Sequence, residues 1–225
     1  MATSYRYQGA IIPWANTTSS EIYSNQPVPV GLIGMGIALG NILVGATGSV
    51  QTEGVFAVPK ASGPAFTQGF KVWWDAVNLV ALNAPAKNAY FLGWAAEPAL
   101  TSDLSVNVKL GEFEDEGPRV LTLAATGNET LTMADVASGY LTVLVPNSAT
   151  KTITLPSVVL IDNGANIIVK KTATGVNAIT LDPAGTEQIA GGSTYALIAS
   201  NNDLAEFANT GVAWALIDST IATIS

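Results

Sequence analysis

The sequence predicts an all-β protein built from two domains. Runs of about four to eight residues rich in Val, Ile, Thr and aromatic side chains recur along the chain, and Gly, Pro and Asn separate them. The clearest alternation spans Leu104–Leu110, where every second residue is apolar and shares one face. No helical periodicity is long enough to compete. We therefore expect short strands joined by turns throughout the 225 residues.

Charge divides the chain into two parts. Residues 1–111 carry five basic and five acidic residues, whereas residues 120–225 carry three lysines against eight acids. Between them, residues 112–119 hold four acids and Arg119, together with Gly117-Pro118. This composition is typical of a solvated linker. The sequence thus predicts a first domain at 1–111, an acidic linker at 112–119 and a second domain at 120–225.

The first domain is predicted to be a β-sandwich or a partly open barrel. Val28–Ala46 is apolar enough to imitate a membrane span, but Pro29, Asn41 and five glycines interrupt it. Two buried strands fit this stretch better, and we expect no membrane association. The expected strands lie at residues 10–14, 28–33, 35–39, 54–58, 71–75, 90–95 and 105–110.

The second domain is predicted to be a small β-sandwich that ends in a meander. Asn201-Asn202 and Asn209–Gly211 are plausible tight turns between its last three strands. Trp214 lies on an alternating apolar face of the final strand, so it is expected to fill the core. The expected strands lie at residues 151–156, 166–170, 177–182, 195–200, 203–209 and 212–218.

The composition excludes most catalytic chemistry. The chain has no Cys and no His, and only 12% of its residues are charged. Thiolate sites, histidine metal sites and histidine acid–base catalysis are therefore excluded. The acids of the linker lack the spacing of a calcium loop, and no basic stripe is present to neutralise phosphates. We expect no enzyme, no cofactor, no metal and no nucleic-acid partner.

A series of short motifs in the first half resembles a known family. The motifs are Tyr7-Gln-Gly9 continuing to Trp14, Pro27–Gly31, Gly34–Ile42, Gly54–Lys60, Gln68–Asp75, Leu92–Glu97 and Val106–Gly111. Their order and spacing over residues 7–111 resemble the capsid decoration, or cement, proteins of phage heads. The sequence departs from that pattern at Ser19–Ile22, where the family tends to use a glycine turn. The resemblance implies a small β-barrel or β-tulip-like domain that binds the outer face of an assembled head without catalysis.

The second half resembles small β modules of phage tail fibres and other virion appendages. The similarity covers roughly residues 121–218 and rests on Thr152–Pro156, Ile167–Lys171, Leu181–Gly185 and Ala213–Ile217. It raises the alternative that this domain is a fibre-like adhesin that binds a host-surface glycan. A hydrolase pairing Asp162 with Asp182 is a third reading, but no motif brings two acids together.

Seven apolar residues are candidate contacts with the capsid or with sister subunits. The segment 1–15 is too apolar for a free terminus, and an extended arm can add main-chain hydrogen bonds at a sheet edge. Adjacent strand residues Trp73 and Trp74 must point to opposite faces, which suggests that a partner covers one face. The candidates are Tyr5, Tyr7, Ile11, Ile12, Trp14, Trp73 and Trp74.

The sequence therefore predicts a virion structural protein. It would bind the lattice of the major capsid protein on the outer surface of a phage head, after synthesis in the host cytoplasm. By binding the expanded lattice and not the precursor, it would stabilise the shell by mass action. A homotrimer is expected, with a dimer as the alternative. The acidic second domain would project outward.

Overall fold

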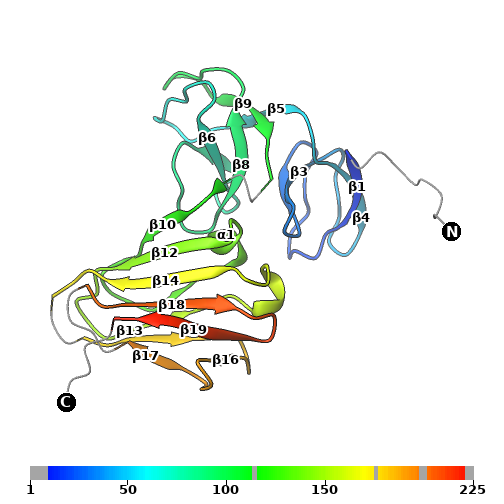
Figure 1. The fold of residues 1–225 in the computed structure, drawn as a ribbon. Helices are drawn as coiled ribbons and strands as arrows, with labels where there is room; N and C mark the ends of the chain where they lie inside the picture. The colour runs from blue at the N-terminus through cyan, green and yellow to red at the C-terminus, as the bar shows by residue number, and fades with distance from the viewer. Residues whose placement is uncertain (1–9, 113–115, 175–176, 198–201, 221–225) are drawn as a thin grey trace, which may run out of the picture. The chain divides into compact units, whose positions relative to one another are not determined.

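The computed structural model describes residues 10–112, 116–174, 177–197 and 202–220. The chain divides into two compact units, the first formed by residues 1–84 and 89–115 and the second by residues 85–88 and 116–225. The described residues form four sheets, the short helix α1 (Met133–Val136) and the 3-10 helix η2 (Val158–Leu160), so the predicted all-β class is confirmed (Figure 1). The predicted domain boundaries at 111 and 120 stay a prediction.

The first unit contains a four-stranded antiparallel sheet with the order β1-β4-β3-β2. Its apolar core includes Val28, Ala38 and Val50, with Ile12 and Trp14 packed against them. The strands are β1 (Ile11–Ala15), β2 (Pro27–Val30), β3 (Gly34–Ala38) and β4 (Thr47–Gln51).

A five-stranded antiparallel sheet with the order β5-β9-β8-β6-β7 completes the first unit. Where β8 crosses β9, the chain requires a glycine: Gly93 has φ +142°, and a Cβ there would lie 1.9 Å from the Lys109 carbonyl oxygen. The strands are β5 (Val55–Pro59), β6 (Lys71–Asp75), β7 (Val80–Leu82), β8 (Ala89–Ala95) and β9 (Ser105–Leu110).

The seven strands expected in this unit are all present, with ends that shift by up to three residues. Two strands, β4 and β7, were not expected. The membrane-like stretch at residues 28–46 forms β2, β3 and their turns, and none of the described helices is long and apolar enough to cross a bilayer.

The second unit is a β-solenoid of about three turns, and the prediction of a β-sandwich is wrong. Its chain alternates between two sheets, and each new strand lies parallel to the one before it in the same sheet. One sheet receives β10 (Arg119–Thr122), β12 (Tyr140–Val145) and β14 (Asn166–Lys171). The other receives β11 (Glu129–Thr130), β13 (Lys151–Thr154) and β15 (Ile179–Asp182).

Antiparallel strands follow the last coil, but they do not form the predicted meander. β17 (Tyr195–Leu197) pairs with β15 in one sheet, whereas β18 (Leu204–Asn209) and β19 (Ala213–Ser219) form a hairpin in the other. β16 (Gln188–Ile189) lies parallel to β19 at the edge of that sheet. Trp214 is 1% exposed within the shared core, so its expected core role is confirmed. The predicted turn at Asn201-Asn202 falls partly outside the described residues.

Residues 85–88 belong to the second unit although they lie between β7 and β8 in sequence. The backbone N–H of Asn88 donates to Asp135 Oδ1 (2.8 Å), and Lys87 forms an ion pair with Glu129. Arg119 donates to the carbonyl oxygens of Ala134 (2.5 Å) and Ala86. The first coil and α1 are thus joined to a four-residue segment from earlier in the chain.

The segment predicted as a solvated linker is partly buried in the second unit. Glu116 is 4% exposed and Arg119 is 2% exposed, and Arg119 Nε lies 3.6 Å from Glu116 Oε1. Burial lowers the pKa of Arg119, while the carboxylates of Glu116 and Asp135 oppose that shift. Residues 113–115 lie outside the described residues.

Candidate interaction surfaces of the first unit

The first unit has surface features that a partner could contact. Among the described residues, no group of three or more acidic, His or Cys side chains could hold a metal ion. The first unit instead presents a groove, a small pocket and an apolar loop.

The first unit has a groove of about 570 Å³. Strands β1 and β2 contribute Trp14 and two prolines, and strands β6 and β8 contribute Trp74 and Tyr90. Its volume is typical of protein sites for small ligands or peptide segments. We call this hollow the aromatic groove; the rest of its lining is Thr18, Ser20, Glu21, Ile22, Tyr23, Gln26, Val28, Ala76, Val77 and Leu79.

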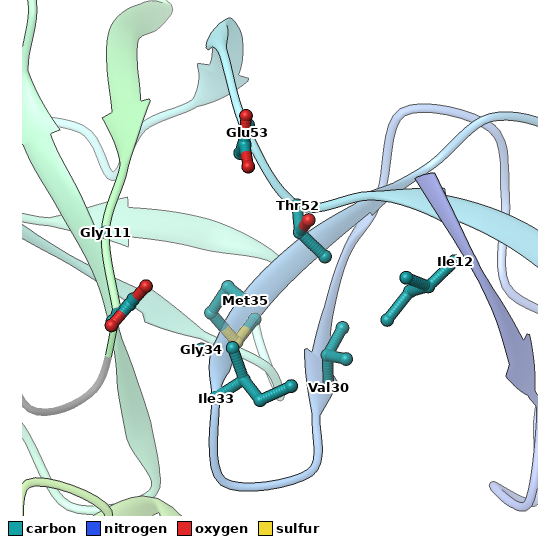
Figure 2. A pocket seen from close by; sticks show the side chains of 9 residues that line it. Ile12, Val30, Ile33, Gly34, Met35, Thr52, Glu53 and Gly111 are labelled. Carbon is teal, nitrogen blue, oxygen red and sulfur yellow. The ribbon is translucent and has the colours of Figure 1, made fainter. Parts of the chain in front are cut away.

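A smaller pocket of about 210 Å³ lies beside the start of β1 (Figure 2). Figure 2 shows the apolar side chains of Ile12, Val30 and Ile33 around it, and the exposed carboxylates of Glu53 and Glu112 also line it. Its volume is below the usual range of small-molecule sites.

The turn between β3 and β4 exposes large apolar side chains. Leu43 is 62% exposed, Val44 57% and Leu39 44%, and nearby Tyr23 is 59% exposed. Ile42 instead points inward at 2% exposed, and its backbone forms two hydrogen bonds with Ile22. We call the four exposed side chains, Leu39, Leu43, Val44 and Tyr23, the apolar tip. Exposed apolar clusters on a soluble protein mark interaction sites.

The predicted contact residues of β1 are built into the sheet of the first unit. Ile11 is 46% exposed, whereas Ile12 and Trp14 are half-buried and pack against its core. Trp14 Nε1 donates to the Pro29 carbonyl oxygen at 2.8 Å. Tyr5 and Tyr7 lie outside the described residues. Residues 11–15 therefore form strand β1 of this sheet, and the predicted contact of residues 1–15 with a partner stays a prediction.

The predicted contact residues of β6 are both buried by the first unit itself. Trp73 is 8% exposed and packs edge-on against Phe91 with ring centroids 6.2 Å apart. Trp74 is 1% exposed and lies under the aromatic groove. The two rings point to opposite faces as expected, but the chain covers both faces. A contact through either ring stays a prediction.

Sequence reasoning missed the apolar tip. Three of its residues, Leu39, Leu43 and Val44, lie in the uniformly apolar stretch that was interpreted as membrane-like or buried, and Tyr23 lies outside that stretch. The one available signal was the pair Gly40 and Gly45, which bracket Asn41–Val44 as a turn and so favour exposure of its side chains.

Comparison with known proteins gives a family match within the first unit. No curated protein matches the chain. Nothing found identifies the second unit as tail-fibre-like, so that resemblance gains no support. The motifs described above, and the antiparallel sheets that they build, lie, apart from Gly111, in the range that matches one family. Residues 7–110 match the phage cement protein family, which implies a structural, capsid-associated role.

Proposed function

We propose that this protein decorates and stabilises the outer surface of a phage head by binding the lattice of the major capsid protein. The family match over residues 7–110 carries the proposal, because it covers nearly all of the first unit. The apolar tip supplies a surface of the kind that protein interfaces bury. A protein that binds the mature lattice more tightly than its precursor stabilises the mature shell by mass action.

The second unit projects outward in this proposal. Residues 120–225 have a net charge of −5, which packaged DNA would repel. The protein therefore acts at the virion surface after synthesis in the host cytoplasm. We further propose that it binds as a homotrimer, since decoration at a symmetry axis calls for matching subunits, and a dimer is the alternative.

The experiment compares capsid binding by two matched double variants of the full chain. Leu43→Ser with Val44→Ser removes the centre of the apolar tip, and Val159→Ser with Leu160→Ser removes an equally exposed apolar pair of the second unit. Co-sedimentation with purified expanded heads should show at least tenfold weaker binding for the first variant, about 1.4 kcal/mol. The second variant should bind as the wild type does. Equal binding by all three proteins would exclude the apolar tip as a capsid contact. If none of the three proteins bound the heads, the proposed decoration function would be refuted.

The structure does not favour the adhesin alternative. The second unit has four aromatic residues, and two of them, Phe207 and Trp214, are at most 1% exposed. Tyr195 packs edge-on against Phe207 with ring centroids 5.1 Å apart. That leaves Tyr140, at 56% exposed, which is too little for a stacked sugar platform.

A further inference from the structure

Three buried polar residues lie at one end of the solenoid, on neighbouring strands. Asn147 follows β12, Lys171 is the last residue of β14, and Asp203 directly precedes β18. Their exposed fractions are 0%, 0% and 8%. Val145 pairs with Lys171 in the parallel register, so Asn147 lies two residues further along the same face.

A shared hydrogen-bond acceptor brings the lysine and the asparagine together. Lys171 Nζ donates to the Asn177 carbonyl oxygen at 2.7 Å, and Asn147 Nδ2 donates to the same oxygen at 3.1 Å. The two nitrogens are therefore no more than 5.8 Å apart, the sum of those distances. Reacting atoms must approach to about 3–3.5 Å, which rotation about the four torsions of a lysine side chain can supply.

The Asn147 carboxamide is only half satisfied. Its nitrogen donates to the carbonyl oxygens of Ala149 and Asn177, but its buried oxygen Oδ1 has no hydrogen-bond partner. Buried polar atoms without a partner are rare in folded proteins and call for an explanation. A carbonyl carbon beside a buried amine is an electrophile next to a nucleophile.

Asp203 lies next to Lys171, directly before β18, the strand that pairs with β14. The backbone N–H of Lys171 donates to the Asp203 carbonyl oxygen at 3.0 Å. Burial lowers the pKa of Lys171, and the charge of Asp203 opposes that shift less strongly. Burial thus favours the neutral, nucleophilic amine more than water does, and the Asp203 carboxylate is close enough for its charge to act on Lys171.

We propose that Lys171 and Asn147 form an intramolecular isopeptide bond. The Lys171 ammonium gives a proton to Asp203, and the free amine attacks Cγ of Asn147. A C–N bond forms between Nζ and Cγ, and the bond from Cγ to Nδ2 breaks. The leaving nitrogen takes the proton that Asp203 holds and departs as ammonia. As the amide forms, Nζ releases its second proton to the solvent, and the ammonia takes up one proton from the solvent to become ammonium. No oxidant or cofactor is needed, and the bond links the second and third coils.

Intact mass spectrometry of the denatured full-length protein tests the proposal directly. The wild type should be lighter than its sequence by one ammonia, about 17 Da. Lys171→Arg, Asn147→Ser and Asp203→Ala should each have the mass of their sequence, whether or not they fold. Lys151→Arg is the control, because Lys151 is equally buried but donates to Ala124 and lies beside Glu129; it should keep the deficit.

Peptide mapping then locates the lost ammonia. Because trypsin does not cleave after an acylated lysine, the link joins the peptide 120–151 to a peptide that begins at Lys171. A wild-type mass equal to that of the sequence would overturn the proposal. So would a deficit mapped to Asn163, since an asparagine before a glycine loses ammonia by closing a succinimide ring.

Discussion

Replacing Asp135 with alanine should destabilise the second unit more than any single surface change. The carboxylate is fully buried, and its two oxygens accept from two backbone N–H groups. Asn88 N donates to Oδ1 and Thr132 N donates to Oδ2, both at 2.8 Å. Alanine would leave both donors without an acceptor and would also remove one of the negative charges near buried Arg119.

The magnitude follows from those two donors. A hydrogen bond to a charged group contributes about 1.5–3 kcal/mol, so the loss of both predicts a cost of about 3–6 kcal/mol. With a urea dependence of about 2 kcal/mol per molar, the unfolding midpoint of the unit should fall by about 2 M. Asp135→Asn keeps one acceptor oxygen and should recover about half of the loss.

Hydrogen exchange at the amides of β12 and β14, followed as urea is added, reports on the second unit alone. Asp218→Ala is the matched control, because Asp218 is exposed and accepts from its neighbour Ser219 N. If Asp135→Ala lowered the protection of these strands no more than Asp218→Ala does, residues 85–88 would not be part of the stability of this unit.

Three further changes test other parts of the fold. Gly93→Ala should prevent the native pairing of β8 with β9, since its Cβ would overlap the Lys109 carbonyl. The near-ultraviolet circular dichroism of the first unit's tryptophans should then be lost. The hydrogen bond from Lys87 lowers the pKa of Glu129 in the folded protein. The Glu129 carboxylate therefore stabilises the fold above its unfolded pKa of about 4.3, and this stabilisation is lost as the pH falls through the lower folded pKa. Glu129→Gln should flatten the acid side of a stability–pH profile measured in urea. Asn209→Ala should lower the unfolding free energy by about 2–4 kcal/mol in urea titrations, because its side chain donates to three carbonyl oxygens and accepts from a backbone N–H; an unchanged midpoint would refute that reasoning.

Local pattern was enough to predict strands whose side chains alternate strongly. Lys71–Asp75 and Ser105–Leu110 have the predicted bounds, and the rest of the expected strands of the first unit differ by a few residues at their ends. Thr47–Gln51 was missed because it carries one large apolar side chain; it is a strand because it pairs with both β1 and β3. That pairing is a tertiary effect that no local pattern contains.

The solenoid could not be distinguished from a sandwich by the same reasoning. Both folds use short strands with one apolar face, and they differ only in which strands are neighbours. Lys151 and Lys171 made the choice harder, since lysines near strand ends favour an exposed position. Both are at most 1% exposed, and their ammonium groups donate to backbone carbonyls at the ends of coils. The candidate surfaces could not be predicted from the sequence either, because the exposure of the apolar tip depends on which turn residues the folded sheet leaves uncovered.

Residues 85–88 lie within the sequence of the first unit but belong to the second, and this limits where the two units can be separated in a fusion protein. A designer who cut the chain at the acidic segment and attached a foreign cargo to the first unit would leave these four residues behind, with the backbone N–H of Asn88 deprived of Asp135. The excised second unit would in turn lack the carbonyl oxygen of Ala86 for Arg119 and the ammonium of Lys87 for Glu129. A graft that transfers the solenoid to another carrier therefore has to bring the β7–β8 connection with it, and a display scaffold built from the first unit needs a new sequence at that loop.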